Sequence, residues 1–219
     1  MKKFLIGTLT ACFLLTGCGD EKIPEPDENS TQTEEKTSVT ENQRRDQKKI
    51  ESETNFYAER ARDNYERKNY REAVNDATEA IRIDGANVNA YTCRGNAYNA
   101  LGNYHDAVAD LSKVIELDPN NANAYGGRGV AFANTGDYNK AVSDFDKAIS
   151  LKPTADNYEN RGLVHGNMGN FDKALADFDK VISLKPTAEA YRRRAQCHEA
   201  LGDNEKAQAD LKKSRELAK

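Results

Sequence analysis

Hydrophobic residues in the second three-quarters of the chain follow the spacing of short amphipathic helices. The clearest stretch has apolar residues at intervals of one, four, seven and eight positions: Ala141, Val142, Phe145, Ala148 and Ile149. This spacing puts them on one face of a helix, because an α-helix completes a turn every 3.6 residues. Proline follows this helix and two others like it and is expected to end them, at Pro119, Pro153 and Pro186.

A second, weaker helical pattern precedes each of these helices. Tyr125, Arg128, Gly129 and Phe132 recur at steps of three and four residues. The pattern stops near a glycine, and glycine recurs at the same place, at Gly102, Gly136, Gly169 and Gly202. A tight turn between two helices favours positive φ, which glycine adopts without strain. The sequence therefore predicts helix-turn-helix units.

These units repeat. The stretch GDYNKAVSDFDKAISLKP at 136–153 recurs with few changes as GNFDKALADFDKVISLKP at 169–186. When the copies are aligned, a position that recurs in each of them forms a column. Two independent columns show steps of 34, 34, 33 and 33 residues: Ala73, Ala107, Ala141, Ala174 and Ala207, and Tyr57, Tyr91, Tyr125, Tyr158 and Tyr191. One helix pair cannot bury its apolar face alone, so five copies are expected to stack and share a core.

The repeated residues resemble the tetratricopeptide repeat signature. The third copy carries it through Tyr125, Gly129, Phe132, Ala141, Phe145, Ala148 and Pro153. The resemblance covers residues 54–219 and implies an all-α, right-handed α-solenoid of five helix-turn-helix repeats, at about 54–87, 88–121, 122–154, 155–187 and 188–219. The first and last copies depart most from the signature, as capping repeats do. Gly129 is expected to let paired helices approach closely.

One pair of columns lies outside that signature. An arginine and, sixteen residues later, an aspartate occur in every repeat: Arg60 and Asp76, Arg94 and Asp110, Arg128 and Asp144, Arg161 and Asp177, Arg194 and Asp210. We predict a structural Arg–Asp ladder that links first and second helices, within a repeat or to the next one. The alternative is a set of solvated surface charges, each pair contributing only ~0–1 kcal/mol.

The N-terminus has the pattern of a secretion signal. Two lysines precede an apolar run and then small residues, too short a stretch for a stable membrane span. Residues 15–18, LTGC, resemble the bacterial lipobox, which implies that 1–17 are a lipoprotein signal peptide and that Cys18 carries the lipid anchor, palmitate included. Several acyl chains anchor a protein stably. Gly19 follows the cysteine, a position where aspartate often signals inner-membrane retention. In a Gram-negative cell this favours the outer membrane, facing the periplasm, over the inner membrane, which stays the alternative.

Composition separates a tether from the repeats. Residues 18–43 have almost no large apolar side chains and are predicted to be a disordered acidic tether. Residues 44–53 are expected as a helical lead-in to the repeat domain at 54–219. From residue 44 onward 28 basic residues balance 28 acidic ones. A neutral solenoid without a basic stripe argues against nucleic acid as a partner.

The sequence contains no pattern of residues that is typical of a catalytic site. The chain has only three histidines, and His165 and His198 fall in a packing column of the repeats. Neither a phosphate-binding glycine loop nor a metal-spaced Cys and His set is present. Cys93 and Cys197 lie three repeats apart, too far to bridge, and are expected as free thiols. We therefore predict a protein that is not an enzyme and uses no cofactor and no metal.

In tetratricopeptide proteins the first helices line a concave groove, and the resemblance implies the same here. The predicted protein-binding residues are mostly amides: Asn89, Asn96, Asn99, Asn123, Asn134, Asn160, Asn167, Arg192, Arg193 and Gln196. Amides both donate and accept hydrogen bonds, so they suit the backbone of an extended peptide. The alternative is that asparagine merely tolerates water. The lysines of carboxylate-clamping relatives are replaced by Thr92, Gly126 and Glu159, which argues against such a clamp.

These observations lead to one functional hypothesis and one alternative. The first is a membrane-anchored scaffold or adaptor of the bacterial cell envelope that binds another envelope protein, or a peptide segment of one, on its concave face. The alternative is a structural envelope protein that self-associates through the ends of the repeat stack and has no peptide ligand.

Overall fold

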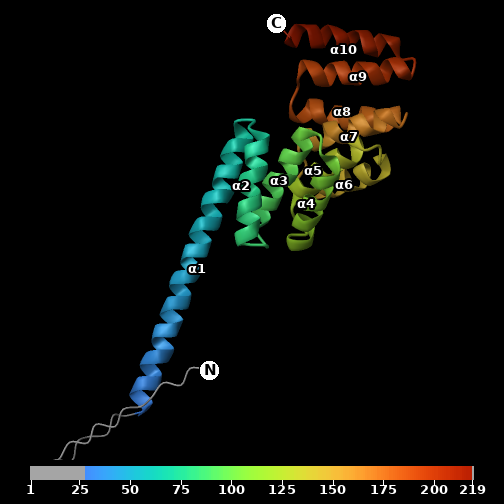
Figure 1. Ribbon diagram of the computed structural model, residues 1–219. Helices are drawn as coiled ribbons and strands as arrows, with labels where there is room; N and C mark the ends of the chain where they lie inside the picture. Colours follow the sequence, from blue (N-terminus) through green and yellow to red (C-terminus); the bar gives the residue numbers. More distant parts are fainter. Residues whose placement is uncertain (1–27, 219) are drawn as a thin grey trace, which may run out of the picture. The chain divides into compact units, whose positions relative to one another are not determined.

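The computed structural model describes residues 28–218, and this part of the chain is all helical (Figure 1). The signal peptide and the lipid-anchor residue Cys18 lie outside the described residues. The helices are α1 Glu28–Glu66, α2 Tyr70–Ile83, α3 Val88–Leu101, α4 Tyr104–Leu117, α5 Ala122–Asn134, α6 Tyr138–Leu151, α7 Ala155–Asn167, α8 Phe171–Leu184, α9 Ala188–Ala200 and α10 Asn204–Leu217. Within 28–218 no helix combines the length and hydropathy needed to cross a bilayer.

The structure differs from the sequence prediction over the second half of the acidic segment. Residues 28–43, expected to be disordered, form the beginning of α1. This stretch contains neither glycine nor proline, and its four glutamates and two glutamines favour helix. Large apolar side chains are not needed to form a helix, because its backbone hydrogen bonds lie within the segment itself. Elongating an existing helix also costs far less than nucleating one.

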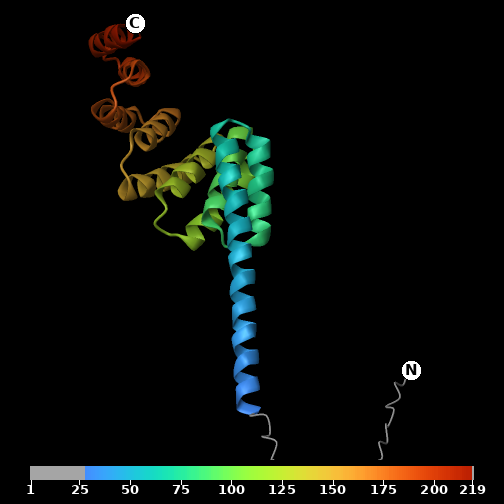
Figure 2. The same ribbon diagram turned by 90° about the vertical axis from the view of Figure 1, so that its left-hand side faces the viewer.

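From Arg45 onward the chain forms one compact unit of stacked helix pairs. The pairs α3 and α4, α5 and α6, α7 and α8, and α9 and α10 begin at the predicted repeat boundaries, and the end of α1 pairs with α2 to form the first repeat. From α3 onward, each helix packs against the one before it in the chain (Figure 2). First helices also contact the next first helix, α3 with α5 and α5 with α7. The first helices therefore line the more closely spaced, inner side of the stack.

Local sequence signals place the helix ends. A side-chain oxygen of the residue before each later first helix accepts a hydrogen bond from the third helical amide, as in Asn87 to Ala90 N at 2.9 Å. Asn121, Thr154 and Thr187 cap the other first helices in the same way. At the helix-helix turns the four predicted glycines have φ between 76° and 85°. Lys68 takes this place in the first repeat, with φ of 65°.

The core lies between the two helices of each pair and between successive pairs. Its largest fully buried side chains come from second helices: Leu111, Val114, Phe145 and Phe178. Glycines of the first helices face them. A Cβ atom at Gly129 would lie 3.0 Å from two ring atoms of Phe145, and one at Gly95 would lie 2.8 Å from Leu111 Cγ. Close helix approach, as predicted for Gly129, is therefore a property of several repeats.

We expect Gly95→Ala to destabilise the protein by ~1–3 kcal/mol, because the added methyl group overlaps a fully buried leucine. Gly166→Ala is the matched control. It also lies in a first helix, but nothing approaches its Cβ position within 4 Å, so the better helix propensity of alanine should stabilise the protein by about 0.5–1 kcal/mol. Urea unfolding measures both changes, and equal effects at the two positions would contradict this account of the packing.

Candidate functional site

The Arg–Asp ladder is present in all five repeats, and each pair lies within one repeat. Every arginine donates from Nε and Nη2 to the two carboxylate oxygens of its aspartate, as in Arg94 to Asp110 at 2.7 and 2.8 Å and Arg128 to Asp144 at 2.8 and 2.9 Å. The remaining pairs have the same two-bond geometry: Arg60 and Asp76, Arg161 and Asp177, Arg194 and Asp210. Such bidentate, charge-assisted pairs are the strong form of the ion pair.

Burial separates this ladder from ordinary surface ion pairs. The five aspartates are only 3–7% exposed. Hydrogen bonding to the partner aspartate raises the pKa of the guanidinium in Arg94 and Arg128 above its usual value. The arginines therefore stay charged, and removing one would leave a carboxylate buried without its counter-charge.

The same arginines also join consecutive repeats. The third nitrogen, Nη1, donates to the residue two positions after the aspartate of the preceding repeat. Arg94 thereby reaches Thr78 Oγ1 at 3.1 Å, and Arg128 reaches Ser112 Oγ at 3.0 Å. In the later repeats the acceptor is a carboxylate, with Arg161 to Asp146 at 2.5 Å and Arg194 to Asp179 at 2.6 Å.

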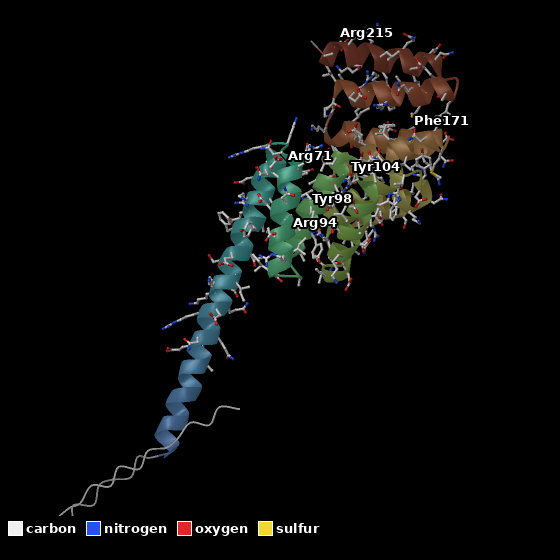
Figure 3. All side chains as sticks on the ribbon, viewed as in Figure 1. Arg71, Arg94, Tyr98, Tyr104, Phe171 and Arg215 are labelled. Carbon is white, nitrogen blue, oxygen red and sulfur yellow. The ribbon has the colours of Figure 1, made fainter. Side chains whose placement is uncertain are left out.

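The tyrosine column completes each unit of the ladder. The guanidinium carbon lies 5.0–5.8 Å from the ring centre of the tyrosine three residues earlier in the same first helix, in every repeat from Tyr57 to Tyr191. This is the range of cation–π contact. Arg94, labelled on α3 in Figure 3, is one of them. The tyrosine column thus helps to hold each arginine in line with its aspartate.

The inner face formed by the first helices has a hollow of about 310 Å³ between the end of α1 and α3. It is lined by Asn87, which precedes α3, and by inner-face columns of two successive repeats: Asn55, Ala58, Glu59, Arg62 and Tyr65, then Asn89, Thr92, Cys93 and Asn96. The sequence prediction included Asn89 and Asn96 but left out the first repeat. Moving back 34 residues along each column finds the missing residues, because the repeat period extends to this helix.

Not all predicted groove amides face solvent with free hydrogen-bonding groups. Asn99 Nδ2 donates to the carbonyl oxygen of Gly127 at 2.8 Å and so holds two repeats together. Asn134 Nδ2 donates to Val130 O in its own helix at 2.9 Å. Asn89, Asn123, Asn167 and Gln196 are exposed, while Asn96 and Asn160 are half-buried.

Two adjacent glycines of α5 let its neighbours approach this face. A Cβ atom at Gly126 would lie 2.8 Å from Asn157 Oδ1, and one at Gly127 would lie 2.9 Å from Asn96 Oδ1. The asparagines of α3 and α7 therefore lie directly against the backbone of the middle repeat. Sequence reasoning placed Gly126 in the groove but did not detect the close contacts of either glycine, which depend on the stacking distance.

The two arginines at the C-terminal end of the groove are already ion-paired. Glu189 pairs with Arg192 and, at 2.6 Å, with Arg193 Nε. The hydrogen bond from Arg192 lowers the pKa of Glu189, so the carboxylate stays ionised. An acidic ligand at this end would have to compete with Glu189.

His165, His198 and the two cysteines of the repeats lie mainly in the packing between helices. His165 is 7% exposed, and burial lowers its pKa. Cys197 is buried, Cys93 is half-buried, and both are free thiols, as expected. Burial raises the pKa of Cys93 to about 11, which makes a reactive thiolate rare at neutral pH. Within 28–218, His, Cys, Asp and Glu side chains form no group able to hold a metal ion.

Family comparisons agree with this architecture. A model described as TPR repeat matches residues 95–136, and models described as tetratricopeptide repeat match 122–154, 155–187 and 188–219. Together these matches extend from residue 95 to 219, more than half of the chain. The chain therefore belongs to the tetratricopeptide repeat proteins, whose fold is a scaffold for protein–protein interaction.

Solved structures show the same fold. A crystal structure of MamA protein is 29% identical, with a TM-score of 0.67, covering 75% of this chain and 91% of that one. MamA from Desulfovibrio magneticus RS-1 is 21% identical, with a TM-score of 0.69 and coverage of 76% and 95%. A thermophilic TPR protein from Thermus thermophilus is 20% identical, with a TM-score of 0.62 and coverage of 75% and 91%. Among curated proteins none matches the sequence.

Because the aspartates of the ladder are more deeply buried than the arginines, replacing an arginine should destabilise the protein more than replacing its aspartate. We expect Arg128→Met to lower the free energy of unfolding by about 3–5 kcal/mol, because it leaves the Asp144 carboxylate buried without its partner. Asp144→Asn leaves the less buried arginine behind and should cost less, ~1–3 kcal/mol. Both losses should persist at high salt, since burial limits screening. Urea unfolding in low and high salt measures them, and unchanged stability of Asp144→Asn in both would indicate solvated charges instead.

Proposed function

We propose that this protein is a lipid-anchored scaffold of the bacterial cell envelope, which binds an extended segment of another envelope protein on the inner face of its repeats. The observation that carries the proposal is the row of exposed and half-buried amides on the first helices, which continues into the hollow between α1 and α3.

The chemistry of this face suits a peptide backbone. Asn123, Asn160 and Gln196 make no side-chain hydrogen bond within the described residues, so their amides are available to a ligand. An amide pairs with either the N–H or the C=O of an extended chain and demands no particular side chain. The hollow between α1 and α3 adds a pocket for one side chain, with a cation, Arg62, and an anion, Glu59, at its wall.

The anchor is proposed from sequence. The apolar run after Lys2 and Lys3, followed by Leu-Thr-Gly-Cys, matches the processing signal of bacterial lipoproteins. Lipidation of Cys18 would hold the repeats at a membrane surface without a transmembrane helix. In a Gram-negative cell, Gly19 after the cysteine favours the outer membrane over the inner one, with the repeats facing the periplasm.

The anchor is tested by comparing the natural protein with Cys18→Ser in a bacterium that processes lipoproteins. We expect the natural protein in the membrane fraction and labelled by an alkyne analogue of palmitate. The variant should lose the label and no longer resist extraction with carbonate. A membrane-bound, unlabelled natural protein would contradict lipidation at Cys18.

The groove is tested by cross-linking the full chain to its neighbours in native membranes and identifying what is captured. The groove variant replaces Asn123, Asn160 and Gln196 by alanine. The matched control replaces Asn75, Asn139 and Gln208, which are exposed amides on second helices. We expect a discrete partner with the natural chain and with the control, and its loss with the groove variant.

Two results would contradict the inner-face site. The groove and control variants could capture the same partners, which would move the binding surface elsewhere. The chain could also capture only copies of itself, which would favour the self-associating structural protein instead. Thermal unfolding of both variants checks that neither result comes from loss of the fold.

A further inference from the structure

The two ends of the repeat stack differ in what they offer to another helix. Inside the stack, each first helix has a position that packs against the second helix of the preceding repeat. This position holds alanine in three of the four later repeats, and Ala90, Ala124 and Ala190 are fully buried, in core clusters with Ala80, Val114 and Val181 respectively. In the first repeat the same position is Phe56, which is 55% exposed.

The arginine beside it also has an unused donor. In the four later repeats Nη1 of the ladder arginine donates to a hydroxyl or carboxylate of the preceding second helix. Arg60 holds Asp76 with its other two nitrogens, and no described residue accepts a hydrogen bond from its Nη1. Its guanidinium lies 5.1 Å from the ring centre of Phe56, so the donor and the aromatic ring form one surface.

The opposite end of the stack is closed to this kind of packing. The position that receives the arginine of a following repeat is Thr78, Ser112, Asp146 and Asp179 in the first four repeats, but it is Lys212 in the fifth. The neighbouring interface position, Val181 in the fourth repeat, is Ser214 in the fifth, and its hydroxyl donates to Ala188 O at 2.7 Å. A second copy stacked head to tail would place Lys212 against Arg60, with like charges in contact.

We propose that the surface of α1 around Phe56 and Arg60 is a docking site for an acidic amphipathic helix of another protein, packed as a preceding second helix would be. The internal interfaces define its chemistry. A carboxylate would take the place of Asp146 or Asp179 and accept from Arg60 Nη1. A small residue would face Phe56, since phenylalanine fills space that alanine leaves free at the internal positions.

The chain itself contains a suitable probe. Helix α6 combines a carboxylate, Asp146, with a small residue, Ala148, at the two interface positions. A fluorescent peptide with the sequence of residues 136–153, held helical by a lactam bridge on its outer face, is titrated with the full chain. We expect saturable binding below about 1 mM that weakens with added salt. Asp146→Lys in the peptide should weaken binding at least about tenfold.

Variants of the full chain locate the site. Phe56→Glu should weaken binding at least about tenfold, because it removes the ring and repels the carboxylate of the peptide. Ile50→Glu is the matched control: it changes another exposed apolar residue of α1, on a different side of the helix, and should leave binding unchanged. Both residues are exposed, so the unfolding temperature should not change. The variant of Asn123, Asn160 and Gln196 should bind the peptide normally, which separates this site from the proposed groove.

Three results would overturn the proposal: no saturable binding up to about 1 mM, binding that survives both Phe56→Glu and the peptide change, or equal losses with Phe56→Glu and Ile50→Glu. Sedimentation of the full chain adds one more outcome. A dimer that Phe56→Glu dissociates would assign this surface to a second copy of the chain instead of a partner helix.

Discussion

The architecture depends on one guanidinium group per repeat. It holds an aspartate of its own repeat with two nitrogens and lies against a tyrosine of its own helix. In every repeat after the first, its third nitrogen also donates to the preceding repeat. Small apolar residues let helices slide or rotate against each other, since alanine and glycine offer few distinctive shapes. A planar group with fixed donor directions does not tolerate such movement. The ladder therefore sets the rotation of each helix pair and the step from one repeat to the next.

This constraint determines what the inner face can do. With α3, α5 and α7 held close together, some polar side chains of that face are used to join repeats, such as Asn99 to the backbone of Gly127. Others remain available, and between α1 and α3 the stack leaves a hollow lined by both helices. Structure and binding thus draw on the same columns of residues, and the distance between neighbouring first helices decides which role each asparagine has.

The ends of the stack follow from the same ladder. Every ladder arginine after the first donates to acceptors in two repeats, whereas among the described residues Arg60 donates only to Asp76. At the other end of the stack, Lys212 stands where the acceptor would be. Serine at 214 and lysine at 212 make the last helix compatible with water, as a capping repeat requires. Phe56 does the opposite and keeps a large apolar side chain exposed at the first repeat. The two ends of the stack therefore differ because single residues depart from columns that are otherwise repeated.

The sequence itself determined the repeat architecture and the residues of the ladder. Period and columns were enough to predict five helix pairs, the turns at Gly102, Gly136, Gly169 and Gly202, and the residues of the ladder, because repetition turns one weak local signal into five consistent ones. Tertiary structure alone decided that each arginine after the first bridges two repeats, that Asn99 and Asn134 are already bonded, and that Gly126 and Gly127 accommodate asparagines of neighbouring helices. These contacts join residues of different repeats or depend on rotamers. They are set by the distance and angle between stacked helices, which hydrophobic spacing along one chain does not encode.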